Sequence, residues 1–137
     1  MKTFFDSSAF AKRYVEEPGS QTVDLLCQEA TEVALSVLCV PEIISALIRR
    51  VREDLLTHRQ YREAKQSLAQ DIRDAVIVNL VPQVVSTCTK VLEASPVRAA
   101  DALQIACAIE WETELFVSAD KRQISAAKKA GLHTKLV

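Results

Sequence analysis

The chain has 137 residues, of which 49% are hydrophobic and 26% charged, a balance typical of one soluble domain with its own core. No apolar run approaches the roughly 20 residues of a membrane span, and Asp6 comes too early for a signal peptide. We therefore expect a cytoplasmic protein with no membrane partner. The formal net charge of −1 does not by itself mark a nucleic-acid binder.

Short apolar stretches alternate with longer amphipathic ones along the whole chain. The predicted elements, in chain order, are a strand at Thr3–Asp6, helices at Ala9–Glu16 and from Ser20 to Glu29, a strand at Val33–Ser36, helices at Pro41–Glu53 and Thr57–Asp74, a strand at Ala75–Leu80, helices at Pro82–Glu93 and from Ser95 to Trp111, a strand at Leu115–Val117, a helix at Lys121–Ala130 and a strand at Thr134–Val137. Strands that alternate with helices predict an α/β domain with a mostly parallel sheet. Because the strands are continuously apolar, we expect helices on both faces of that sheet.

Serines and prolines supply the expected helix starts. Ser7 or Ser8 can cap the first helix and Ser20 the second, since a side-chain hydroxyl accepts from a free backbone N–H at a helix start. Ser95 is expected to cap a helix with Pro96 at its first position.

Four acidic residues occur where apolar strands end or helices begin: Asp6, Glu42, Asp101 and Asp120. Ligands of parallel α/β sheets bind beyond the carboxyl ends of the strands, and these acids are placed to reach that edge. Carboxylates that converge there repel one another unless a cation neutralises them. The pattern indicates a hard metal ion held by oxygen ligands, as in phosphodiesterases.

Each acid also has a plain structural interpretation. Asp6 and Asp120 could simply cap helices, and Glu42 in a first helical turn is favoured by the helix dipole. Asp101 is the most unusual of the four, because on a helix it shares a face with Ile105 and Ala108. The four acids together are more specific than any one of them.

Basic residues are unevenly distributed despite the near-neutral total. Arg49, Arg50 and Arg52 follow one another closely in the middle of the chain, and a second basic group begins at Lys121. They are either solvated helix faces or a basic rim that follows a nucleic-acid backbone around the four acids.

Four short motifs follow one another in the sequence: Asp6-Ser7-Ser8-Ala9, Pro41-Glu42, Arg98-Ala99-Ala100-Asp101-Ala102-Leu103 and Ser118-Ala119-Asp120. Their order resembles that of the PIN-domain ribonucleases. Size and motif spacing are similar to the VapC-type toxins of prokaryotic toxin–antitoxin pairs. The resemblance covers essentially the whole chain.

The resemblance implies a single PIN domain over residues 1–137, with a Rossmann-like α/β/α sandwich that cleaves RNA with Mg²⁺ or Mn²⁺. It implies that Asp6, Glu42, Asp101 and Asp120 form the catalytic, metal-binding pocket, with Ser8 and Ser118 as supporting hydroxyls. It also implies a homodimer and inhibition by a cognate VapB-like antitoxin. Some relatives have a further acid after the last motif, where this chain has Lys121, so the number of metal ions is open.

Two other functions are compatible with parts of the pattern. A haloacid-dehalogenase-like phosphatase would use Asp6 as its nucleophile, but that class has a second Asp where this chain has Ser8. A non-catalytic RNA- or protein-binding module of the same fold is the other alternative.

Overall fold

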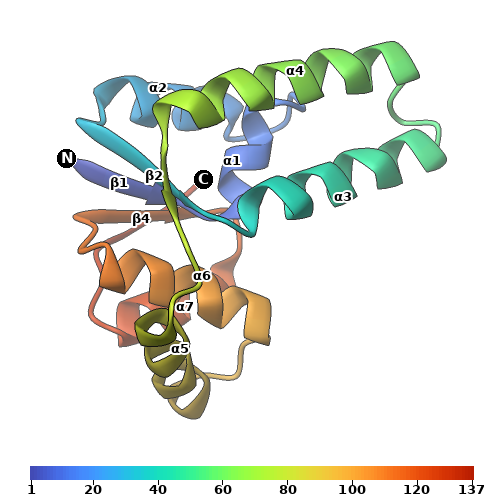
Figure 1. Ribbon diagram of the computed structural model, residues 1–137. Helices are drawn as coiled ribbons and strands as arrows, with labels where there is room; N and C mark the ends of the chain where they lie inside the picture. The colour runs from blue at the N-terminus through green and yellow to red at the C-terminus, as the bar shows by residue number, and fades with distance from the viewer.

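The computed structural model describes residues 1–137 and contains one five-stranded sheet in the order β3-β2-β1-β4-β5, with every neighbouring pair parallel (Figure 1). The strands are β1 (Lys2–Phe5), β2 (Glu32–Ser36), β3 (Val76–Val78), β4 (Leu115–Ser118) and β5 (Thr134–Leu136). The helices are α1 (Ser7–Phe10), a 3-10 turn η1 (Ala11–Arg13), α2 (Ser20–Glu29), α3 (Cys39–Arg52), α4 (His58–Asp74), α5 (Pro82–Ala94), α6 (Ala99–Glu110) and α7 (Lys121–Lys129). The α/β prediction is confirmed, with a sheet that is parallel throughout.

Helices cover both faces of the sheet, as the apolar strands require. Successive strand residues point to opposite faces, and the two hydrophobic clusters divide them accordingly. Phe5, Leu35 and Val117 pack with α1–α4. Phe4, Ala34 and Phe116 pack with α5–α7. In Figure 1 these two groups of helices lie above and below the strands, which gives the expected α/β/α sandwich.

Helices α3 and α4 form an arm that extends beyond the sheet (Figure 1). α3 begins just after the carboxyl end of β2 and runs outward, and α4 returns toward β3. A reciprocal capping box at Thr57 and Gln60 opens α4, because each side chain bonds the other residue's backbone N–H. No helix of the structure has both the length and the apolar character needed to cross a bilayer.

Several predicted helix starts were wrong. Asp6, and not Ser7 or Ser8, is the N-cap of α1, which ends at Phe10 and continues only as a 3-10 turn. Ser20 is the first residue of α2, preceded by Gly19 at φ 98°, a left-handed conformation that favours glycine. Ser95 ends α5 in an extended conformation, and α6 starts only after Arg98.

Candidate functional site

Asp6 lies at the carboxyl end of β1, only 4% exposed. Its Oδ1 accepts from the backbone N–H of Ala9 at 2.9 Å and from the hydroxyl of Ser8 at 2.7 Å. Its Oδ2 accepts from the hydroxyl of Ser118 at 2.5 Å. The carboxylate is therefore a helix cap and, at the same time, the centre of a small hydroxyl network.

The two serines join the ends of β1 and β4. The Ser8 and Ser118 hydroxyl oxygens are 3.3 Å apart, and both also accept backbone N–H groups, from Ala119 and Asp120 respectively. The structure thus places both expected supporting hydroxyls against Asp6. They hold its carboxylate in one orientation beside the chain that leads to Asp120.

The pKa of Asp6 is raised to about 6, mainly by burial and to a smaller extent by the charge of Asp101, while the hydrogen bonds from Ser118, Ser8 and Ala9 partly offset this increase. Burial also raises the pKa of Asp101, and the charges of Asp120 and Glu42 raise it more, while Arg98 lowers it. A carboxylate whose charge raises the pKa of another acid lies near that acid. Asp101 therefore lies near Asp6, Glu42 and Asp120, and these four acids at the carboxyl edge of the sheet are called here the acidic centre.

The members of the acidic centre come from four elements. Asp6 caps α1, Asp101 lies half-buried in the first turn of α6, and Asp120 is the exposed N-cap of α7, accepting from the N–H of Arg122 at 2.8 Å. Glu42 lies in the first turn of α3. The cap interpretation thus holds for Asp6 and Asp120, and it does not exclude a second role, because a capping carboxylate keeps lone pairs for other ligands.

Gln104 is a site residue that the sequence analysis missed. It is 2% exposed, and its Nε2 donates to Glu42 Oε1 at 2.7 Å and to Ser7 Oγ at 2.8 Å. The hydroxyl of Ser7 donates to the same Glu42 oxygen at 2.7 Å. The only signal in the sequence was an amide within the otherwise apolar stretch after Asp101.

The donor atoms of the acidic centre are carboxylate and hydroxyl oxygens. Such a set fits Mg²⁺ or Mn²⁺, and Mg²⁺ in particular keeps several waters and needs only one or two direct carboxylates. As the side chains stand, no three Asp, Glu, His or Cys residues lie close enough to share one ion directly. The residues therefore fit an ion bound partly through water and not a closed, all-protein cage.

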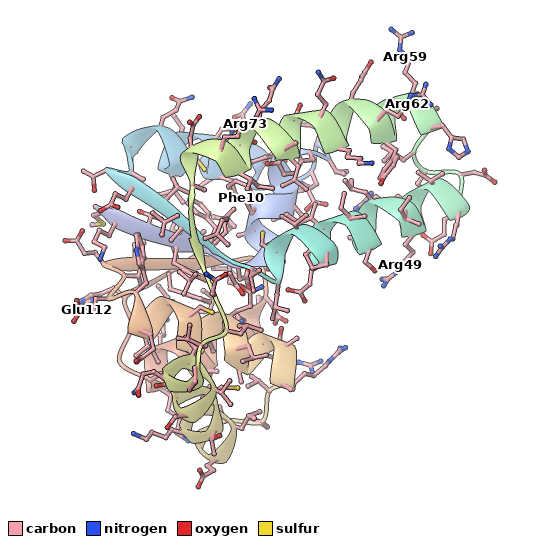
Figure 2. All side chains as sticks on the ribbon, viewed as in Figure 1. Phe10, Arg49, Arg59, Arg62, Arg73 and Glu112 are labelled. Carbon is pink, nitrogen blue, oxygen red and sulfur yellow. The ribbon has the colours of Figure 1, made fainter.

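The three arginines of α3 differ from one another in the structure. Arg50 forms an ion pair with Glu17 at 3.4 Å. Arg49 and Arg52 are exposed, and Figure 2 shows Arg49 on the side of α3 turned away from α4. Glu42 and Arg49 are seven residues apart and so lie on the same helix face, about 10 Å along the axis.

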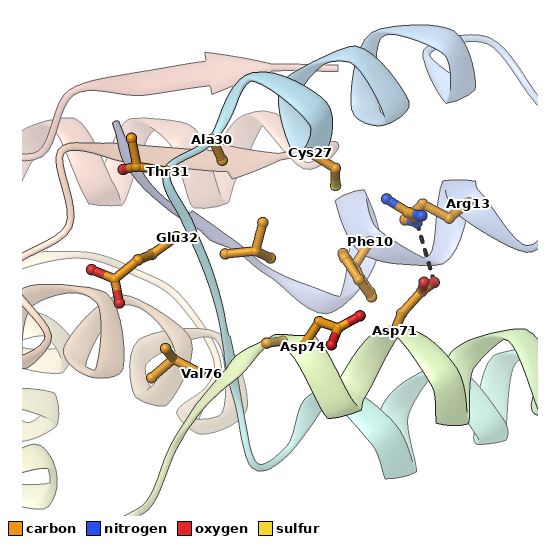
Figure 3. A pocket seen from close by; sticks show the side chains of 11 residues that line it. Phe10, Arg13, Cys27, Ala30, Thr31, Glu32, Asp71, Asp74 and Val76 are labelled. Carbon is orange, nitrogen blue, oxygen red and sulfur yellow. Dashed lines mark ion pairs between the residues drawn. The ribbon is translucent and has the colours of Figure 1, made fainter.

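A separate cavity of about 340 Å³ lies between the carboxyl ends of α2 and α4 and the start of β2 (Figure 3). Two of its charged groups are paired: Arg13 lies 3.3 Å from Asp71, which also accepts a hydrogen bond from the hydroxyl of Tyr14 at 2.6 Å. Glu32, which lines it, opens β2 at the amino end of the sheet. The cavity is therefore not part of the acidic centre.

Fold and site together define a Rossmann-like α/β domain with a group of carboxylates at the carboxyl edge of its sheet. The family model described as PIN domain matches residues 3–129. The chain belongs to the PIN domain family. Family membership and the hydrogen bonds of Asp6 give no reason to assign it the nucleophile role that a haloacid-dehalogenase-like phosphatase would require.

Solved structures share the fold at low sequence identity. VapC20 of Mycobacterium tuberculosis, described as a sarcin-ricin loop cleaving toxin, superposes with a TM-score of 0.70 at 16% identity, over 90% of this chain and 94% of that one. FitAcB of Neisseria gonorrhoeae gives 0.71 at 16%, over 96% and 95%. VapBC2 of Rickettsia felis, solved with a fragment of promoter DNA, gives 0.71 at 12%, over 100% and 99%. No curated protein sequence matches the chain significantly.

Proposed function

We propose that this chain is a divalent-metal-dependent endoribonuclease, the toxin of a toxin–antitoxin pair. The observation that carries the proposal is the acidic centre. There the Ser118 hydroxyl contacts both the Asp6 carboxylate and the backbone N–H of Asp120, and the charges of Asp120 and Glu42 raise the pKa of Asp101. Holding four carboxylates in one region is unfavourable without a cation. Membership of the PIN family and the likeness to VapC20, described as a sarcin-ricin loop cleaving toxin, support the same activity.

In this proposal Asp6, Glu42, Asp101 and Asp120 hold Mg²⁺ or Mn²⁺, partly through water. When bound, the ion lowers the pKa of a water molecule and neutralises charge on the phosphodiester. Ser8 and Ser118 keep Asp6 in place, because both of its oxygens accept from them at 2.7 Å or less. Burial of Asp6 excludes bulk water from one side of the centre and strengthens its attraction for a cation.

We propose Arg49 and Arg52 as the residues of α3 that contact the RNA backbone. Both are exposed and free of ion pairs, and Arg49 shares a helix face with Glu42. Arg50 contributes less, because Glu17 already neutralises it. Aromatic residues make up only 5% of the chain, so backbone contacts are expected to outweigh base stacking.

The proposed partners are an antitoxin and a second copy of the chain. The structures from Rickettsia felis and Haemophilus influenzae are described as VapBC, and FitAB is described as bound to a DNA fragment. We propose that a VapB-like antitoxin closes the acidic centre with an arginine, since a guanidinium binds carboxylates through paired hydrogen bonds. We further propose that the functional unit is a homodimer of single PIN domains, active in the cytoplasm.

The test is cleavage of a single-stranded RNA by the purified chain. EDTA should abolish cleavage, and added Mg²⁺ or Mn²⁺ should restore it. Asp101→Asn, Asp120→Asn and Glu42→Gln should each remove most activity and leave the circular dichroism spectrum unchanged, because the changes are nearly isosteric. Normal cleavage by all three variants would return the acids to their structural roles and favour a non-catalytic binding module of the same fold.

A further inference from the structure

Gln104 occupies a position where an apolar side chain would be expected. It is 2% exposed, and the next residues of α6, from Ile105 to Ala108, are fully buried. Burying an amide is unfavourable unless its polar atoms are hydrogen-bonded. Its Nε2 is bonded, but its Oε1 has no partner at all. The fold therefore keeps a polar side chain here at a loss of stability, which packing alone does not explain.

The bonds of Gln104 form a closed ring with two other side chains. Glu42 Oε1 lies 2.7 Å from both the Nε2 atom of Gln104 and the Ser7 hydroxyl oxygen, and these two donors lie 2.8 Å from each other. A carboxylate only accepts hydrogen bonds, so the NH₂ group of Gln104 has to face Glu42. Both donors reach the same oxygen, Oε1, and no protein group bonds Oε2.

We propose that Gln104 is a positioning residue that fixes the Glu42 carboxylate and leaves Oε2 as the oxygen that faces the metal ion. The ring ties α6 to α1 and α3, the elements that carry Asp101, Asp6 and Glu42. An amide donor suits this role because it orients the carboxylate without competing for the cation. The inference rests on the proposed metal-dependent function and adds a residue that acts through Glu42.

A double-mutant cycle on Mn²⁺ affinity tests the assignment without RNA. The metal-stripped full chain is titrated with Mn²⁺ by calorimetry as wild type, Gln104→Met, Glu42→Gln and the double variant. Methionine has nearly the volume of glutamine but no donor, and it removes the unbonded Oε1, so the fold should persist. Gln104→Met should weaken Mn²⁺ binding roughly tenfold, as loss of an outer partner of a metal ligand typically does.

In the Glu42→Gln background the same change should alter Mn²⁺ affinity by less than about twofold, since the ligand that Gln104 orients is already gone. Equal losses in both backgrounds, or none in the wild-type background, would overturn the positioning role.

Ser7→Ala provides a second variant, which should lose less Mn²⁺ affinity than Gln104→Met, and this loss should again vanish when Glu42 is replaced. If Asp6→Asn abolishes Mn²⁺ binding while Gln104→Met has no effect, the metal centre stands and only the role of Gln104 fails. No Mn²⁺ binding by the wild type would overturn both.

Discussion

Replacing Asp6 by Asn should stabilise the metal-free protein at neutral pH, although it removes a helix-cap carboxylate. Burial raises the pKa of Asp6 from 3.8 to about 6. Each pH unit of that difference corresponds to about 1.4 kcal/mol, so the ionised carboxylate destabilises the folded state by about 3 kcal/mol at pH 7. Asn is neutral, is as good an N-cap as Asp, and keeps an oxygen for the N–H of Ala9.

The sign of the pH dependence follows from the proton balance. Between pH 3.8 and about 6 the folded protein keeps a proton on Asp6 that the unfolded chain has released. Wild-type stability therefore falls as the pH rises through this window, and the Asn variant lacks that contribution. The Asn side chain presents an NH₂ group in place of Oδ2, which weakens the bond with Ser118. We therefore expect a net gain of between about 1 and 3 kcal/mol at pH 7.5, and close to none at pH 3.5.

Urea unfolding in EDTA at the two pH values measures this difference. Asp74→Asn is the matched control, because Asp74 is exposed at the end of α4 and should change stability by less than about 0.5 kcal/mol at either pH. Excess Mn²⁺ should reverse the order, stabilising the wild type by about 4.1 kcal/mol at one thousand times its dissociation constant and the variant much less. A variant less stable than the wild type by 1 kcal/mol or more at pH 7.5 without metal would refute the reasoning, since Asp6 would then be a structural cap alone.

Three further predictions concern RNA, partner and fold. Arg49→Ala should weaken RNA binding and lower the slope of the logarithm of the RNA-binding constant against log salt by about 0.7. Arg50→Ala should leave the slope unchanged, because Arg50 is paired with Glu17. Equal slopes for the two variants in salt-dependent fluorescence anisotropy would contradict this prediction. A VapB-like antitoxin encoded beside the gene should inhibit cleavage less strongly as the Mg²⁺ concentration rises. Deleting the C-terminal basic residues of the antitoxin should abolish the inhibition. Inhibition that depends on neither change would mean that the antitoxin binds outside the acidic centre. Thr57→Ala should lower the free energy of unfolding by about 1 kcal/mol, because it removes the capping box of α4. An unchanged urea midpoint would show that the arm formed by α3 and α4 is stabilised by packing alone.

The strands and long helices could be predicted because their periodicity is local. β1, β2 and β4 are apolar runs that the core needs, and the Thr57–Asp74 segment shows its helical period plainly. Helix starts were less predictable. Ser95 resembles an N-cap in sequence, but it is the buried, extended residue that ends α5, and α6 begins only after Arg98.

The acids of the site could be predicted because each follows a strand or opens a helix, but their partners could not. Nothing in the spacing between Ser7, Glu42 and Gln104 shows that α1, α3 and α6 bring these side chains to within 2.8 Å. The ion pair between Arg50 and Glu17, which are 33 residues apart, could not be predicted from the sequence either. Such contacts depend on the strand order β3-β2-β1-β4-β5, which periodicity does not determine.

The central claim is that the acidic centre holds the metal ion with which this chain cleaves RNA. The most direct measurement compares two titrations of one metal-stripped preparation with Mn²⁺, one recording binding and the other the single-turnover rate of cleavage of a defined single-stranded RNA. We predict that both rise over the same Mn²⁺ concentrations and that Asp101→Asn shifts both to higher concentration by the same factor. Full cleavage in EDTA, or a cleavage rate that stays at zero while the site fills with Mn²⁺, would contradict the claim.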